Sequence, residues 1–179
     1  MSLNRLSESK SLYLLQHAGN PVHWNIWSKD LLRDNSPKHK LMIISIGYSS
    51  CHWCHVMEEE SFEDAEVAEL MNTHYRAVKV DREERPDIDA RYMNSLQLMT
   101  GTGGWPLNII ALPDGTPVYG GTYFSRKDWM AALTQVADLW QKEPEQVLSY
   151  GAQMQEGLQQ MIQVTLKTKP NSFSAQDFE

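Results

Sequence analysis

Cysteine is scarce in this chain of 179 residues, which contains only Cys51 and Cys54. Two cysteines exclude the disulfide scaffold of a small secreted protein. Because they lie three residues apart, a bond between them would close a ring too small to constrain the unfolded chain much. The pair therefore points to chemistry rather than to stability.

Basic residues are in the minority, with 16 Lys and Arg against 23 Asp and Glu, and the formal net charge is −7. A protein that tracks nucleic-acid phosphates needs a basic stripe, so this balance argues against nucleic acid as a partner. No apolar run approaches the roughly 20 residues of a membrane span, so we expect no membrane partner. The N-terminus lacks the apolar stretch of a secretory signal, and we expect a cytoplasmic location.

Hydrophobic residues make up 41% of the chain, enough for the core of one α/β domain. Strands are predicted by short apolar runs, and helices by apolar residues at helical spacing. The strands are expected at 41–46, 77–81, 107–112 and 117–121, the last two as a hairpin, and the helices at 61–74, 85–99, 129–140 and 144–166. This order is that of a thioredoxin-like fold, a central mixed sheet flanked by helices.

The chain divides into four expected parts. Residues 1–40 form an N-terminal arm packed on the core, and 41–141 form the thioredoxin-like domain. Residues 142–166 form a C-terminal helical extension, and the polar residues 167–179 form a tail or linker. Within the arm we expect one helix near Trp24 to Asp34.

Cys51 follows a predicted strand and a short loop, which places it where a helix begins. Free N–H groups and the helix dipole favour a thiolate there. Cys54 lies one turn along on the same face, within reach of a mixed disulfide at Cys51. We therefore predict that Cys51 is an exposed nucleophile and Cys54 a more buried resolving thiol.

The two residues between the cysteines are candidates for tuning the pair. A protonated His52 would add positive charge beside the Cys51 sulfur, and the bulk of Trp53 would shape the approach of a partner. The alternative is a solvated helix N-terminus without tuning. Ser61 and Asp64, farther on, resemble a capping box for the next helix.

Pro106 is predicted to open the third core strand opposite the cysteine pair, with a cis peptide bond to Trp105. Only about 5 to 6% of X–Pro bonds are cis in folded proteins, so this prediction is sharp. The backbone of Trp105 would then be free to bind an extended substrate segment. A strand-initiating proline with Trp105 in the core is the alternative.

Two other kinds of site remain open. Residues 51–55 match the C-x-x-C-H signature of covalent haem attachment, but the motif follows a strand and no export signal is visible. Zinc would need two further ligands from residues such as His17, His23 or His55, and none of these makes a tight second pair. We therefore expect no cofactor and no metal.

Eight segments resemble, in order, the N-terminal thioredoxin-like domain of the spermatogenesis-associated protein 20 family. They are residues 4–6 (NRL), 13–18 (YLLQHA), 20–22 (NPV), 45–49 (SIGYS), 51–57 (CHWCHVM), 80–87 (VDREERPD), 103–107 (GGWPL) and 120–124 (GGTYF). The resemblance implies a thioredoxin fold and a role in protein-disulfide redox chemistry. It also implies a downstream helical domain as a possible partner, which this chain does not include.

The sequence departs from the family at Leu12, where proline is usual, and at His23, where aspartate is usual. Compared with thioredoxins, Ser45 stands in place of a buried acid six residues before the first cysteine, so a base for Cys54 is missing or supplied differently. We predict a thiol–disulfide oxidoreductase acting on a protein or small-molecule disulfide or thiol. The alternative is a non-catalytic binding or redox-sensing module of a longer protein.

Overall fold

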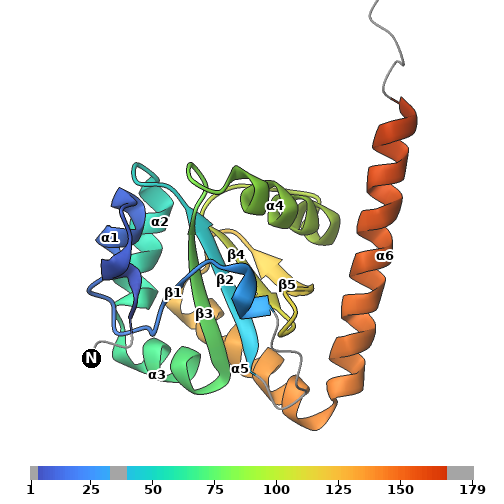
Figure 1. The fold of residues 1–179 in the computed structure, drawn as a ribbon. Helices are drawn as coiled ribbons and strands as arrows, with labels where there is room; N and C mark the ends of the chain where they lie inside the picture. The colour runs from blue at the N-terminus through green and yellow to red at the C-terminus, as the bar shows by residue number, and fades with distance from the viewer. Residues whose placement is uncertain (1–3, 33–39, 169–179) are drawn as a thin grey trace, which may run out of the picture.

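A five-stranded sheet forms the centre of the computed structural model, which describes residues 4–32 and 40–168 (Figure 1). Its strand order is β1-β3-β2-β4-β5. β1 and β2 run parallel to β3, whereas β4 is antiparallel to both β2 and β5. The strands are β1 (Asn25–Ile26), β2 (Leu41–Gly47), β3 (Tyr75–Asp81), β4 (Leu107–Ala111) and β5 (Pro117–Gly121).

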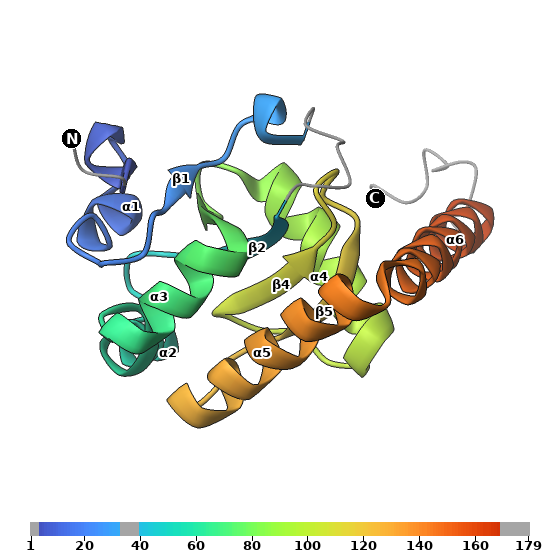
Figure 2. The same ribbon diagram turned by 90° about the horizontal axis from the view of Figure 1, so that it is seen from below.

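Helices cover both faces of this sheet (Figure 2). They are α1 (Leu12–Gln16), α2 (His52–Met57), α3 (Ala65–His74), α4 (Pro86–Thr100), α5 (Arg126–Lys142) and α6 (Pro144–Thr168), with 3₁₀ turns at Leu6–Glu8 and Lys29–Leu32 and a π-helical turn at Glu58–Phe62. One core joins α1, α2, α3 and α5 to the first face, and a second core joins α4 to the other. The predicted thioredoxin-like fold with a mixed, helix-flanked sheet is confirmed.

Alternation along β2 decides which residues face the cysteines. Leu41 and Ile43 belong to the core under α2, whereas Met42 and Ile44 belong to the core under α4. Because successive side chains of a strand point to opposite faces, Ser45 and Gly47 lie on the α2 face.

The N-terminal arm lies against the first core. Leu6, Tyr13, Leu14 and Val22 are all buried within it. Asn4 ties the segment together, since its Nδ2 donates to the carbonyl oxygens of His17 and Asn20.

The expected helix near Trp24 to Asp34 is wrong. The described part of this segment forms β1 and a 3₁₀ turn at Lys29–Leu32, while residues 33–34 lie outside the described ranges. Trp24 and Trp27 are spaced like one helical turn, but they pack into the two different cores. An extended segment puts residues an odd number apart on opposite faces, so the sheet edge accommodates both rings.

The expected capping box at Ser61 is also wrong. Ser61 lies buried in the π-helical turn, and α3 begins after Asp64. The Asp64 carboxylate itself accepts from the backbone N–H groups of Glu66 and Val67 at 3.0 Å each. A short acceptor side chain directly before the helix satisfies these free donors without help from Ser61.

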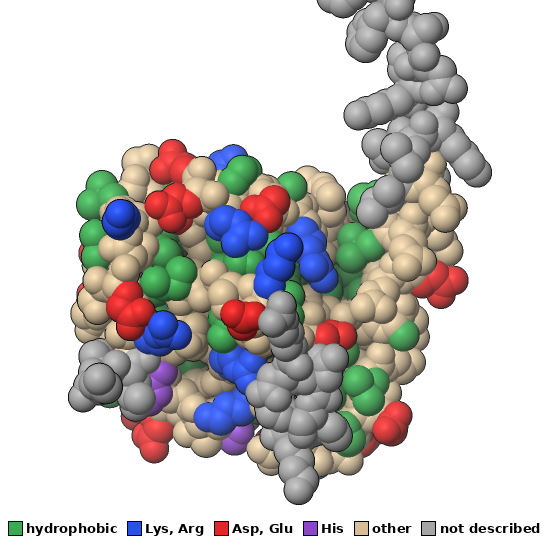
Figure 3. Space-filling view, viewed as in Figure 1, with side chains coloured by type: hydrophobic (Ala, Val, Ile, Leu, Met, Phe, Trp, Pro, Cys, Tyr) green, Lys and Arg blue, Asp and Glu red, His purple; other side chains and the backbone are tan. Residues whose placement is uncertain are grey.

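At the C-terminal side, α6 packs through the buried Val147 and Gly151 and then runs on along the molecule (Figure 1). The expected tail overlaps α6 at 167–168, and 169–179 lie outside the described residues. Across residues 4–32 and 40–168, no helix is both long and apolar enough to cross a bilayer. Basic and acidic side chains are interspersed on the face seen in Figure 3.

Candidate active site

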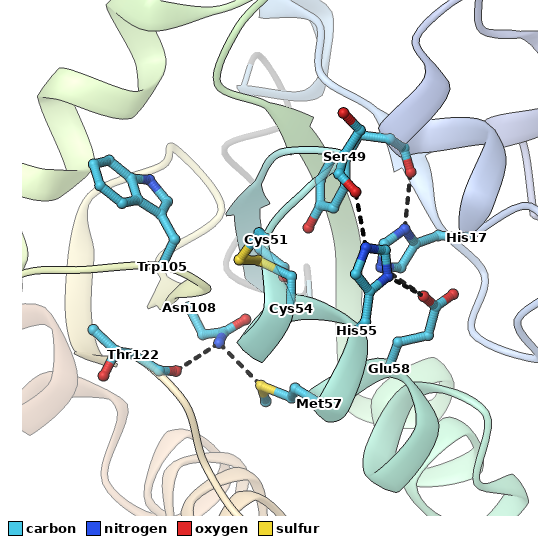
Figure 4. Close-up of a disulfide and its surroundings, with 12 residues drawn as sticks. His17, Ser49, Cys51, Cys54, His55, Met57, Glu58, Trp105, Asn108 and Thr122 are labelled. Atoms are coloured by element: carbon cyan, nitrogen blue, oxygen red, sulfur yellow. Dashed lines mark hydrogen bonds and ion pairs between the residues drawn. A yellow bond between two sulfur atoms is a disulfide. The ribbon is translucent and has the colours of Figure 1, made fainter.

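Cys51 and Cys54 form a disulfide at the junction between β2 and α2 (Figure 4). β2 ends at Gly47, a turn follows in which the Cys51 N–H donates to the Tyr48 carbonyl, and Cys51 is the N-cap of α2. The Cα atoms of the pair lie 5.3 Å apart. The local pattern of strand, turn and helix therefore brings the two predicted sulfurs into direct contact.

Cys51 is not exposed, which corrects the expectation for the nucleophile. Its exposed fraction is 3%, against 1% for Cys54. The bond to Cys54 holds the Cys51 side chain in the first core, against which Tyr48 and Trp105 also pack. In the disulfide form, Cys51 therefore offers little surface to an incoming sulfur.

His52 and Trp53 lie on the outer side of α2. His52 is exposed and Trp53 is 52% exposed, although α2 buries Cys54 directly after them. The Trp53 ring centroid lies 5.0 Å from that of Tyr123 and 5.5 Å from that of His52. The indole thus forms an aromatic rim beside the cysteines.

The peptide bond between Trp105 and Pro106 is cis. β4 begins at Leu107, so the Trp105 backbone lies ahead of the strand pairing. The indole Nε1 donates to Asp89 Oδ1 at 2.8 Å, and the Arg82 guanidinium lies 3.8 Å from the ring centroid. These contacts fix the half-buried Trp105 side chain, which Figure 4 shows across from the disulfide.

A groove of about 220 Å³ lies between these two tryptophans. It is lined by Trp53, Gly103, Gly104, Trp105, Thr122 and Tyr123. The structure thus brings together the predicted tuning residue Trp53 and the predicted substrate-binding residue Trp105, which are 52 positions apart in the chain. His52 is not among the lining residues.

Sequence reasoning missed a polar row on the sheet beneath α2. Lys79 and Asn108 pair with Ser45 from the two neighbouring strands. Lys79 is fully buried, and its Nζ donates to Ser45 Oγ at 3.1 Å. Asn108 Nδ2 donates to the Thr122 carbonyl at 2.8 Å and contacts Met57 Sδ at 3.2 Å (Figure 4). The sequence did contain one indication of this row, because Lys79 lies between the apolar Val78 and Val80 in a predicted strand.

Burial lowers the pKa of Lys79 to about 7, and the nearby Glu58 carboxylate opposes this shift. The ammonium faces aromatic rings, at 4.2 Å from the Phe62 centroid and 4.8 Å from that of Trp24. Ring faces attract a cation that has lost its water. Ser45 and these rings therefore partly replace the hydration of Lys79.

Two of the three proposed zinc-ligand histidines are engaged by other groups. His17 Nδ1 lies 2.9 Å from the Tyr13 carbonyl, and burial lowers the pKa of His17 to about 2, so its ring is neutral. His55 Nε2 lies 2.8 Å from the Ser49 carbonyl (Figure 4). Both rings approach the Glu58 carboxylate, at 3.5 and 3.7 Å. Among the described residues, no three His, Cys, Asp or Glu side chains cluster as metal ligands do.

Comparison with solved structures shows that the chain has a thioredoxin fold. A thioredoxin from Thermus thermophilus matches with a TM-score of 0.54 and 16% identity, over 67% of this chain and 90% of that chain. A structure titled "DsbH Oxidoreductase" matches with a TM-score of 0.50 and 16% identity, over 66% of this chain and 85% of that one. At this identity the matches establish the fold alone.

Sequence relatives are much closer. An uncharacterized protein of Caenorhabditis elegans is 44% identical over 84% of this chain, and rat spermatogenesis-associated protein 20 is 43% identical over 81%. The chain spans only 22% and 19% of their lengths, respectively. The family model Thioredox_DsbH, described as "Protein of unknown function, DUF255", matches residues 3–159. The chain therefore belongs to this thioredoxin-like family, together with the spermatogenesis-associated protein 20 proteins.

Proposed function

We propose that this protein is a thiol–disulfide oxidoreductase that exchanges disulfides through Cys51 and Cys54. The observation that carries the proposal is the bonded pair at the junction of β2 and α2 in a thioredoxin-like fold. A bond across three residues closes too small a loop to stabilise the fold much, so redox exchange is the stronger reason for the pair.

The proposed reaction moves two electrons between the pair and a substrate. In the reducing direction, the Cys51 thiolate attacks a substrate disulfide and displaces one substrate thiolate. The Cys54 thiolate then attacks Cys51 Sγ, which forms the Cys51–Cys54 bond and releases the second substrate thiolate. The substrate is reduced and the pair is oxidised; the opposite direction reverses both steps.

The groove beside the pair supports a peptide as substrate. Trp53 and Trp105 offer apolar surface on either side, and the Trp105 backbone is not part of the sheet. An extended peptide could therefore bind this backbone while its side chains pack on the indoles. We propose a disulfide or dithiol carried on an extended protein segment.

The test compares wild-type protein with Cys51→Ser and Cys54→Ser in an insulin-reduction assay with dithiothreitol as the electron source. We expect the wild type to accelerate insulin reduction and both variants to lose this activity. Once the dithiothreitol is removed from the reduced proteins, only Cys54→Ser should accumulate a stoichiometric mixed disulfide with insulin, because it keeps the attacking sulfur and lacks the resolving one. Equal adduct formation by both variants would contradict the assignment of Cys51.

A second candidate, a non-catalytic binding or redox-sensing module, is favoured by one observation, the 3% exposure of Cys51. Alkylation of the reduced protein across a pH series separates the two. An oxidoreductase should show a Cys51 pKa below the ordinary value of about 8.5. A Cys51 pKa at or above that value, with no insulin reduction by the wild type, would favour the module.

A further inference from the structure

The N-terminal arm places a tyrosine hydroxyl beside the buried sulfur of the pair. A Cβ built on Gly47 would lie 2.5 Å from the Tyr13 hydroxyl oxygen and 2.6 Å from Cys54 Sγ. The oxygen and the sulfur are therefore no farther apart than the sum of these two distances. Gly47, which has no side chain, leaves the gap into which both atoms project.

The Tyr13 side chain is fully buried, and its hydroxyl has no hydrogen-bond partner among the described residues. A buried hydroxyl without a partner costs free energy, so such groups in a native protein call for an explanation. Burial raises the pKa of Tyr13 well above its ordinary value. The hydroxyl therefore keeps its proton and is available as a donor.

We propose that the Tyr13 hydroxyl donates a hydrogen bond to the Cys54 thiolate once the disulfide opens. This inference rests on the proposed function, and it makes Tyr13 a positioning residue that the arm supplies to the cysteine site. It also accounts for Ser45, which cannot serve as the buried acid expected at that place in thioredoxins. A neutral donor from the arm stabilises the charged sulfur in place of a base from the sheet.

The negative charge on Cys54, to which the Tyr13 hydroxyl would donate, forms when the disulfide opens. When a substrate thiolate attacks Cys51 Sγ, the bond between the two cysteine sulfurs breaks and its electron pair stays on Cys54 as a thiolate. A second substrate thiolate then releases Cys51, so the substrate is oxidised and the pair is reduced. In the reverse direction, the same Cys54 thiolate is the attacking group.

Four ionisable side chains face the Tyr13 ring from the elements around it. Lys79 Nζ lies 5.4 Å from the Tyr13 ring centroid, and the His17 ring lies 4.7 Å away. Glu58 and Asp81 both act on the hydroxyl through their charge. Two carboxylates oppose a thiolate here, so the donor from Tyr13 and the cation of Lys79 are the groups that favour it.

The experiment is a ¹³C-NMR titration of the reduced protein labelled at cysteine Cβ, since the chain has only two cysteines to assign. The test variant is Tyr13→Phe, which removes one oxygen atom. The control is Tyr92→Phe, whose buried hydroxyl bonds to the Gly115 carbonyl in the other core. We expect Tyr13→Phe to raise the Cys54 pKa by about one unit, a tenfold loss of thiolate, and Tyr92→Phe to leave it unchanged.

Thermal unfolding of the oxidised proteins should affect the two variants in the opposite order. The Cys54 pKa should change in Tyr13→Phe and not in Tyr92→Phe, whereas the melting temperature should fall in Tyr92→Phe and not in Tyr13→Phe. Tyr13→Phe removes an unpaired hydroxyl and should melt at or above the wild-type temperature, whereas Tyr92→Phe loses a hydrogen bond and should melt lower. An unchanged Cys54 pKa in Tyr13→Phe would overturn the inference. Because the titration of Cys54 needs no turnover, a wild type that is inactive on insulin and has an ordinary Cys51 pKa would contradict the proposed function without deciding the Tyr13 result.

Discussion

A lysine without access to water is the most unusual single residue of the molecule. Lys79 is fully buried on the central strand pair, and it has a serine and aromatic rings as its immediate neighbours. Such a group is costly to keep charged, so its protonation is coupled to folding.

The first prediction concerns the pH dependence of stability. Burial lowers the pKa of Lys79 to about 7 from an ordinary value of 10.5. Between these values the unfolded chain holds a proton that the folded chain has released. The free energy of unfolding should therefore rise with pH, by up to about 1.4 kcal/mol per unit from this group. Urea unfolding of the oxidised protein at pH 7, 8 and 9 measures this rise.

Lys79→Met keeps the length of the side chain and removes the titrating group, so it should flatten the rise. Lys142→Met is the matched control, because Lys142 is exposed on α5 and its loss should leave the slope unchanged. An equally steep rise in the Lys79→Met protein would show that another group causes it.

At the scale of single residues, the cysteine pair and the Trp105–Pro106 bond were predictable because each depends on a short stretch of sequence. The burial of Cys51 was not predictable, since the first core in which it lies is assembled from segments far apart in the sequence. The same holds for Tyr13, which comes from the arm and lies close to Cys54 of α2. Rules based on residue spacing predict which residues lie close together within one helix or strand, but not which distant segments of the chain pack together.

At the scale of elements, Asp64 connects two helices. Its carboxylate caps α3, and it also accepts from Arg126 Nε and Nη2 of α5 at 2.9 and 3.0 Å. One short side chain thus fixes the start of α3 and its position against α5.

The second prediction is that Asp64→Ala lowers the melting temperature by about 3 °C, because both the cap and the link to α5 are lost. Glu69→Ala, at an exposed position in the middle of the same helix, is the control and should change the melting temperature by less than about 1 °C. Differential scanning calorimetry measures both. Equal shifts in the two variants would mean that the cap contributes nothing particular.

Most elements could be predicted from sequence because their patterns are strong and local. β2, β4 and the hairpin to β5 follow from apolar runs and turn residues, and α5 follows from its apolar stripe. β1 could not, because two residues carry no periodicity and exist as a strand only by pairing with β3. The capping residue of α3 was misplaced for a related reason, since the π-helical turn before it has no simple sequence signature.

At the scale of the whole molecule, the two ends of the chain contribute unequally to the core. The arm supplies several fully buried side chains, among them Leu6, Tyr13 and Trp24. α6 supplies the buried Val147 and Gly151, while most of its other described side chains remain at least partly exposed.

The third prediction follows from this inequality. A chain that lacks residues 1–23 should lose cooperative thermal unfolding and near-UV circular dichroism, because the first core is left open beside Lys79 and Phe62. A chain that ends at Glu143 should keep both, with a lower melting temperature. Cooperative unfolding of this shortened chain would show that the rest of the protein folds without residues 1–23.

The arm's place under the cysteine pair links two equilibria. If the Tyr13 hydroxyl holds the reduced sulfur and not the oxidised one, reduction must tighten the attachment of the arm by the same free energy with which the arm favours reduction. A partner that peeled the arm away would then drive the couple toward its bonded form. The attachment of the arm and the reduction potential of the cysteine pair would then be linked in one thermodynamic cycle, so that a change in either could be measured through the other.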